Sequence, residues 1–174
     1  MAASCRSTGG EPLHPYTILQ VLILLALANG TPLAAKKILG NHLLYPLDGG
    51  VRFVDGRPLF GHSKTVRGAV LAVLATMAGA PLVGLEWEIG GFIGSFAMAG
   101  DLFSSFVKRR LNLPPSSRAS GLDQVPESLF PLLACRNLLS LTIADIGACV
   151  VLFFIGEVVL SRVLYAFHLR DRPY

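Results

Sequence analysis

Residues 89–110, IGGFIGSFAMAGDLFSSFVKRR, decide which class of fold the chain can adopt. They begin as an apolar run, and a helix that crosses a membrane needs about 20 mostly apolar residues. The run contains one carboxylate, Asp101, and ends on three consecutive basic residues. An acidic side chain costs about 2.5–3.5 kcal/mol at the centre of a membrane helix and less near an end, and such residues usually have a function. Residues 89–107 are therefore predicted to span a membrane, with a functional carboxylate near the end of the span.

The composition of the whole chain agrees with this prediction. Of 174 residues, 52% are hydrophobic and 15% are charged, whereas soluble domains carry about 25% charged residues. The mean hydropathy is +0.58, and we predict a single integral membrane domain over residues 1–174. The net charge of +4 is assigned to the loops of a membrane protein, where basic residues gather on the cytoplasmic side, and not to a nucleic-acid partner.

Further apolar runs predict an all-α, polytopic fold with five transmembrane helices. The last run, 129–167, would measure about 58 Å as one helix, against a hydrocarbon core of about 30 Å, so we divide it in two. Gly30 and Pro32 are expected to end the first helix. The spans are expected at about 13–29, 68–85, 89–107, 127–143 and 146–167, and two long loops at about 31–67 and 108–126.

Charge predicts the side of the membrane on which each loop lies. Both long loops and the C-terminal tail are rich in Lys and Arg, whereas the short turn after the second span carries Glu86 and Glu88. Basic loops stay in the cytoplasm, so we expect the N-terminus outside and the long loops and the C-terminus inside. This arrangement requires an odd number of spans, which favours five over four. The expected location is the cell membrane, with multiple passes.

If the third helix continues past the end of its span, four polar residues follow helical spacing and should form one stripe: Asp101, Ser104, Ser105 and Lys108. Two roles are open for Asp101. It could pair with Lys108 or be hydrated at the membrane surface, or it could be functional. The functional role is favoured, because intramembrane carboxylates usually have one.

Asp123 and Glu127 stand at the expected start of the fourth helix. Asp123 fits as a helix N-cap, and Glu127 as an acidic residue that complements the helix dipole. Asp123 would also lie at the cytoplasmic ends of the helices, at the level of Asp101. Two carboxylates near clustered cations suit Mg²⁺, which proteins usually hold with one or two carboxylates together with substrate phosphates.

The segment 56–68, GRPLFGHSKTVRG, has the composition of an anion-binding loop. Its glycines let the backbone approach a ligand closely, and Lys64 and Arg67 add positive charge. Thr65 lies directly before the second span, whose N-terminus favours anions. The segment is not a Walker A motif. A basic segment beside a membrane would equally bind anionic lipid headgroups, and both interpretations stay open.

Other polar residues have alternative roles. Asp48 and Asp55 each precede a glycine, which an ordinary turn explains, and a metal or nucleotide contact is the alternative. Asn29 fits as the C-terminal cap of the first helix or as a ligand from that helix into the same cavity. Arg136 is expected inside the fourth helix, where it would face a polar interior or pair with Asp145 of the fifth.

These motifs resemble two families. The block GDLFSSFVKR from position 100, followed by Asp123, resembles the first signature of the phosphatidate cytidylyltransferases, although the chain lacks their later His-Gly-Gly segment. The fuller resemblance is to the archaeal CDP-archaeol synthases, and it covers nearly the whole chain after the N-terminal tail. It is carried by NGTP at position 29, PLDGG at 46, DGRPLFGHSKTVRG at 55, GDLFSSFVKRR at 100 and LDQ at 122.

The resemblance implies a Mg²⁺-dependent nucleotidyltransferase of phospholipid biosynthesis. Such an enzyme transfers CMP from CTP to 2,3-bis-O-geranylgeranylglyceryl phosphate, an isoprenoid ether lipid phosphate, and releases pyrophosphate. Asp101 and Asp123 would bind Mg²⁺, while Lys108 and Arg109 would hold the lipid phosphate or neutralise the pyrophosphate. The residues expected to bind CTP are Asn29, Asp48, Asp55, Lys64, Thr65, Arg67 and Ser105. The expected partners are CTP, the lipid phosphate and membrane lipids, without an obligate protein partner.

Three other functions would use parts of the same pattern. A CDP-alcohol phosphotransferase would need a D-G-x-x-A-R signature, which the sequence lacks. A small anion transporter or channel with a basic cytoplasmic vestibule is the main alternative, although no inverted repeat is visible. A membrane anchor for a partner protein would have no use for Asp101 within a span.

Overall fold

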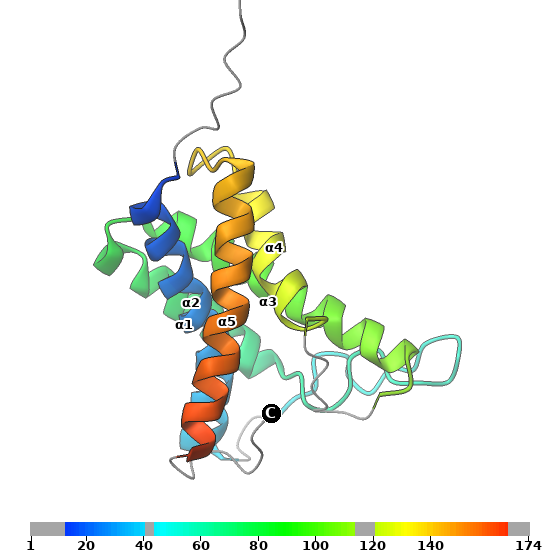
Figure 1. Cartoon of the computed structure of the whole chain (residues 1–174). Coiled ribbons are helices and arrows are strands. Elements are labelled where there is room, and N and C mark those ends of the chain that lie inside the picture. The colour runs from blue at the N-terminus through cyan, green and yellow to red at the C-terminus, as the bar shows by residue number, and fades with distance from the viewer. Residues whose placement is uncertain (1–12, 41–43, 114–120, 167–174) are drawn as a thin grey trace, which may run out of the picture.

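The structure is a computed structural model that describes residues 13–40, 44–113 and 121–166, and this part of the chain is helical with no β-strand (Figure 1). The all-α prediction is therefore confirmed for the described residues. The helices are α1 (Pro15–Leu39), α2 (Val66–Gly79), α3 (Trp87–Arg110), α4 (Gln124–Ala134) and α5 (Ile143–Ala166), with a short 3₁₀ helix η1 (Pro81–Val83). Four segments are long and apolar enough to cross a membrane: Pro15–Leu39, Val66–Val83, Trp87–Arg110 and Ile143–Arg162.

Successive helices alternate in direction, so the molecule has two distinct ends (Figure 1). The loop end carries the segment 44–65, the last turns of α1, α3 and α5, and the first turns of α2 and α4. The turn end carries η1 and the start of α1 and α5. There the backbone N–H of His14 donates to Oδ1 of Asp145 at 2.8 Å, and the His14 ring nitrogen Nδ1 lies 2.8 Å from Oδ2. α1 and α5 therefore start side by side and run in the same direction.

The first helix is longer than the sequence predicted. α1 does not end at Gly30 and Pro32 but continues to Leu39, over 25 residues. A proline removes one backbone N–H from a helix, and in membrane helices nearby hydroxyl groups help to satisfy the backbone around it. Here the Thr31 hydroxyl donates to the carbonyl of Leu27 at 2.6 Å. The first long loop therefore begins about ten residues later than expected, and the last turns of α1 become a wall at the loop end.

The fourth helix is shorter than the sequence predicted. α4 has 11 residues, about 16 Å of helix, which is too short to cross a hydrocarbon core of about 30 Å alone. The expected helix over 127–143 is therefore wrong in its second half, where residues 135–140 form turns. Arg136 is exposed in these turns, together with the polar Asn137. Both roles considered for Arg136 are therefore wrong, because it is exposed and does not face a polar interior, and Asp145 is bonded to His14 instead.

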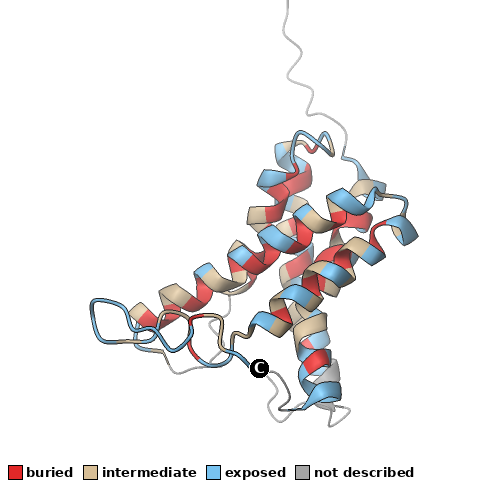
Figure 2. Ribbon diagram, turned by 180° about the vertical axis from the view of Figure 1, so that it is seen from behind, coloured by how far each residue is buried: buried red, intermediate tan, exposed pale blue. Residues whose placement is uncertain are grey.

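Small residues bring α2 and α3 together. A Cβ atom added at Gly90 would lie 2.3 Å from the carbonyl oxygen of Thr76, and one added at Gly94 would lie 2.2 Å from the Thr76 hydroxyl. Buried residues follow the inner faces of the helices, while residues on the outer faces are exposed (Figure 2). Those outer faces carry large apolar side chains such as Val70 and Leu152. Helices that are apolar on every face are typical of membrane spans.

Candidate active site

A cleft of about 280 Å³ opens at the loop end, between the segment 44–65 and every α-helix except α2. Its walls bring together residues that are more than 120 positions apart in the sequence, since both Asn29 and Glu157 line it. Of the residues that the sequence assigned to catalysis or to CTP binding, those lining the cleft are Asn29, Lys64, Asp101, Ser105, Lys108, Arg109 and Asp123. The four that do not line it are Asp48, Asp55, Thr65 and Arg67.

The polar stripe of α3 forms one wall of the cleft. Asp101 does not pair with Lys108 on its own helix; instead the Lys64 ammonium donates to both of its carboxylate oxygens, at 2.5 and 2.6 Å. Ser105 faces the cleft one turn further on and is buried. Both partners of the Lys64–Asp101 pair are about three-quarters buried, with 24% and 23% of their side chains exposed. The pair ties the segment before α2 to the middle of α3.

A second lysine–carboxylate pair joins α3 to α4. The Lys108 ammonium lies 2.7 Å from a carboxylate oxygen of Asp123, and the two side chains are 8% and 19% exposed. Asp123 occupies the N-cap position of α4, but its side chain makes no capping hydrogen bond. Its carboxylate therefore serves the cleft and not the helix end, as the N-cap alternative would have required. Arg109, also buried, lines the cleft beside this pair.

Gly100 lets α4 approach the carboxylate wall. A Cβ atom on Gly100 would lie 2.2 Å from the carbonyl oxygen of Pro126 and 2.8 Å from Cα of Glu127, so the two backbones are in direct contact. Glu127 is 4% exposed and lines the cleft. Its carboxylate oxygen Oε1 is buried without a hydrogen-bond partner among the described residues. The sequence assigned Glu127 only to the helix dipole, and this contact gives it a place at the site.

α5 adds a carboxylate that the sequence analysis missed. Glu157 lines the cleft, and its Oε1 accepts a hydrogen bond of 2.6 Å from the side-chain amide of Asn29. Asn29 therefore acts from within α1 and not as its C-terminal cap. The signal for Glu157 was available, because an acidic residue in an apolar run meets the same criterion that drew attention to Asp101.

Asp48 shapes the segment 44–65 from inside. Its carboxylate accepts hydrogen bonds from the backbone N–H groups of Gly50, Phe60 and Gly61, at 2.9 to 3.1 Å. Burial alone would raise the pKa of Asp48, but these backbone hydrogen bonds outweigh it and hold the pKa below the ordinary aspartate value. By linkage, their stabilisation is present above the unfolded-state pKa and is lost as the pH falls through the lowered one. The structure gives Asp48 a scaffold role, and its predicted contact with CTP stays a prediction.

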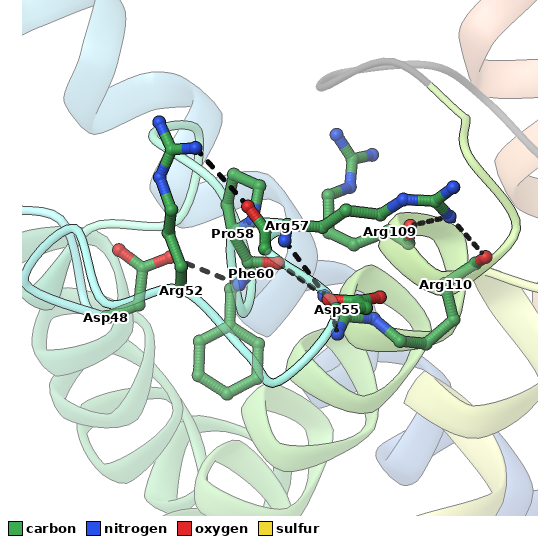
Figure 3. Close-up of polar contacts among 9 residues, drawn as sticks. Asp48, Arg52, Asp55, Arg57, Pro58, Phe60, Arg109 and Arg110 are labelled. Atoms are coloured by element: carbon green, nitrogen blue, oxygen red, sulfur yellow. Dashed lines mark hydrogen bonds and ion pairs between the residues drawn. The ribbon is translucent and has the colours of Figure 1, made fainter.

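Asp55 and two arginines fasten the same segment to the end of α3 (Figure 3). Arg110 donates to Asp55 and to the carbonyl of Pro58, both at 2.7 Å. Arg57 donates to the carbonyl of Arg110 at 2.7 Å and to that of Arg109 at 3.3 Å. The carbonyls of Arg109 and Arg110 belong to the last turn of α3, and no further helical N–H group follows to bond them. These hydrogen bonds of Asp55, Arg57 and Arg110, here called the clamp, fix the segment that carries Lys64 against the helix that carries Asp101.

Thr65 and Arg67 lie at the start of α2, beside the cleft and not in its walls. The Thr65 hydroxyl caps the helix by accepting from the N–H of Gly68 at 3.2 Å. The Arg67 guanidinium donates to the carbonyl of Gly40 at 3.2 Å, just after α1. Both residues therefore hold the segment that presents Lys64. Their direct contact with a nucleotide remains a prediction.

The cleft combines four cationic side chains with four carboxylates at one end of a helical bundle. Lysine and arginine bind phosphate oxygens, and carboxylates bind the cations that accompany phosphates. These features define the chain as a membrane-embedded helical protein whose site is suited to phosphate chemistry.

Known proteins of similar sequence and fold identify the family. The family model of the CarS-like CDP-archaeol synthases matches residues 84–174. The CDP-archaeol synthase of Sulfurisphaera tokodaii is 35% identical over 171 residues, which cover 94% of this chain and 99% of that protein. The one of Pyrococcus furiosus is 39% identical over 107 residues, 56% of this chain and 60% of that protein. This chain belongs to the CDP-archaeol synthase family.

The fold comparison agrees with this assignment. A solved structure of an intramembrane enzyme for archaeal membrane lipids biosynthesis matches with a TM-score of 0.72 at 28% identity, covering 82% of this chain and 90% of that one. The match supports the membrane location that the apolar helices indicate. The alternative of an anion transporter or channel is not supported by any of these relatives.

Proposed function

We propose that this protein transfers CMP from CTP to an isoprenoid ether lipid phosphate, unsaturated archaetidic acid, and so forms CDP-archaeol and pyrophosphate. The observation that carries the proposal is the cleft in which the pairs Lys64–Asp101 and Lys108–Asp123 meet. The names of the relatives support the same reaction. The natural setting is membrane phospholipid biosynthesis.

The reaction joins two anions, and this decides what the protein must supply. An oxygen of the lipid phosphate attacks the α-phosphorus of CTP and forms a new P–O bond. The bond from the α-phosphorus to the oxygen that bridges to the β-phosphorus breaks, and pyrophosphate leaves with the electron pair. The attacking oxygen is already anionic, so no general base is required. The protein has to hold the reactants in line and offset their charge, which is the main means of catalysis in phosphoryl transfer.

The cationic side chains of the cleft divide this task. Lys64, presented by the clamped segment, contacts the triphosphate of CTP. Lys108 and Arg109 hold the lipid phosphate or neutralise the departing pyrophosphate. Asn29 and Ser105 supply neutral hydrogen-bonding groups for the nucleotide. Substrate phosphates would displace the ammonium groups from their carboxylates, which then become available to a metal ion.

The residues present fit Mg²⁺. Asp101 and Asp123 already hold cationic groups in the form of lysine ammonium, and the buried Oε1 of Glu127 has no hydrogen-bond partner among the described residues. No group of three or more His, Cys, Asp or Glu side chains within the described ranges is arranged to hold a metal by itself, and Mg²⁺ usually depends on substrate phosphates to complete its ligands. Asp101 and Asp123 would hold the ion, which when bound neutralises charge on the transferring phosphates.

The proposed orientation places the loop end in the cytoplasm, where CTP is available. Its support is the alternation of the helices and the basic residues of the two long loops. A maleimide that cannot cross membranes, applied to intact cells in a Cys5→Ser background, should label Glu86→Cys at the turn end. Arg52→Cys at the loop end should be labelled only after lysis, and Cys135 and Cys149 are buried. The reverse pattern would reject the orientation.

Pyrophosphate release by the purified protein in detergent tests the function. The assay contains Mg²⁺, CTP and the geranylgeranyl ether phosphate, with ATP, GTP and UTP in parallel reactions. We expect release that requires the lipid phosphate and prefers CTP, and that stops when EDTA removes the metal. Folded protein that releases no pyrophosphate with any nucleotide would contradict the proposal. Release that persists in EDTA would support the transferase activity but contradict its proposed dependence on a metal ion.

A further inference from the structure

Lys36 differs from the other lysines of the cleft. It lies in the last turns of α1 and lines the cleft. Lys64 and Lys108 are each bonded to a carboxylate, whereas Lys36 is exposed and makes no hydrogen bond or ion pair with any residue that the structure describes. The sequence analysis placed this position in a loop. The continuation of α1 beyond Pro32 makes Lys36 part of a helical wall.

The wall around Lys36 is apolar, unlike the walls formed by α3 and α4. Pro32 and Leu33 line the cleft one turn before it, at the helical spacings that put them on the same face as Lys36. Leu33 is 47% exposed. The facing walls carry Asp101 and Asp123 with their lysines. Beyond Asn29, which bonds Glu157 deeper along the same helix, the α1 side of the cleft therefore combines the Lys36 ammonium with apolar surface, whereas the α3 and α4 side combines cations with carboxylates.

The level of Lys36 suits a molecule that arrives within the membrane. α1 is an apolar span of 25 residues, about 37 Å long, and so extends past a hydrocarbon core of about 30 Å. Lys36 and Lys37 occupy its last turn, so a membrane centred on the apolar part of α1 would place them at the depth of the lipid headgroups. A phosphomonoester of a lipid carries a charge of about −1.5 to −2 at neutral pH, and its chains need apolar contact just below the phosphate.

We propose that Lys36 and the apolar face before it form the subsite for the lipid substrate, with the Lys36 ammonium binding the phosphomonoester. The inference rests on the proposed function and deepens it. It separates the two anions that the reaction joins: the lipid phosphate enters along α1, and the triphosphate lies against α3, α4 and the segment with Lys64. Lys108 and Arg109 are then left to neutralise pyrophosphate.

Steady-state kinetics with each substrate varied separately test this subsite. In mixed micelles, Lys36→Gln should raise the KM for the ether lipid phosphate by about tenfold, as expected for the loss of one charged hydrogen bond. The KM for CTP should stay within about twofold of wild type, since Lys36 does not contact the triphosphate. Lys36→Arg, which keeps the charge, should recover most of the lipid affinity.

Lys37→Gln is the matched control, because Lys37 is an exposed neighbour in the same helical turn and does not line the cleft. If both lysines only anchor α1 at the membrane surface, the two Gln variants will behave alike, and the subsite is rejected. A rise in the KM for CTP in Lys36→Gln, without one for the lipid, would also overturn it. Because wild type runs in the same assay, a failed subsite leaves wild-type activity intact, whereas a failed function leaves no activity to compare.

Discussion

Asp101→Asn and Asp123→Asn are each expected to lower kcat/KM by about a hundredfold or more, the range found when one preorganised electrostatic group is removed from an active site. Each carboxylate faces the cleft and holds a lysine ammonium at 2.5 to 2.7 Å. An amide keeps the size but loses the charge, so it cannot balance that lysine and is a weaker, neutral ligand for Mg²⁺. Pyrophosphate release measures the rate, and equilibrium dialysis with CTP at graded Mg²⁺ concentrations measures binding.

Glu88→Gln is the control for these variants. It is the same carboxylate-to-amide change, made in the helix that carries Asp101, but Glu88 is exposed in the first turn of α3 at the turn end. Its activity should equal that of wild type within about twofold, because exposed substitutions of this kind change stability by about 0.5 kcal/mol or less. Either aspartate variant, folded and with nearly normal Mg²⁺-dependent activity, would remove that carboxylate from the proposed mechanism.

The helix boundaries show where sequence reasoning reached its limit. The apolar runs predicted an all-helical membrane fold, because hydrophobic length is a property of the sequence itself, but of the five expected spans only four described segments are long and apolar enough to cross a membrane. They did not predict that α1 continues through Pro32, because a membrane helix tolerates a proline that would end or kink a soluble one. They extended α4 too far, because an apolar run does not reveal that Arg136 reaches solvent through a turn.

For the candidate site too, the sequence predicted some features and not others. Asp101, Lys108 and Asp123 could be predicted, because charges within or beside apolar segments stand out. Their pairing could not be predicted, because Asp101 binds Lys64 of a distant loop and not Lys108 of its own helix. Lys36 was hidden by a helix boundary placed too early.

Gly100→Ala is expected to damage the site without changing any polar residue. The added Cβ would lie 2.2 Å from the Pro126 oxygen and 2.5 Å from its carbonyl carbon, and backbone atoms cannot move aside as a flexible side chain can. α4 must shift, and overpacking of this kind costs about 1–3 kcal/mol. We expect a thermal midpoint several degrees lower in detergent, by the usual relation between stability and midpoint. Activity should fall by about tenfold or more, since misplacement of about 1 Å can cost a hundredfold.

Gly147→Ala provides the comparison, because a Cβ on this glycine of α5 meets nothing within 4 Å. It should be neutral or slightly stabilising, as alanine is favoured over glycine in helices by about 1 kcal/mol. If Gly100→Ala has the same thermal midpoint and the same activity as Gly147→Ala, then α3 and α4 do not cross as closely as described. If it loses activity more steeply than stability, the glycine acts by setting the distance between the two carboxylate-bearing helices. The adjacent positions 100 and 101 then have one physical purpose: the glycine admits α4, and α4 brings Asp123 and Glu127 to the cleft that Asp101 lines.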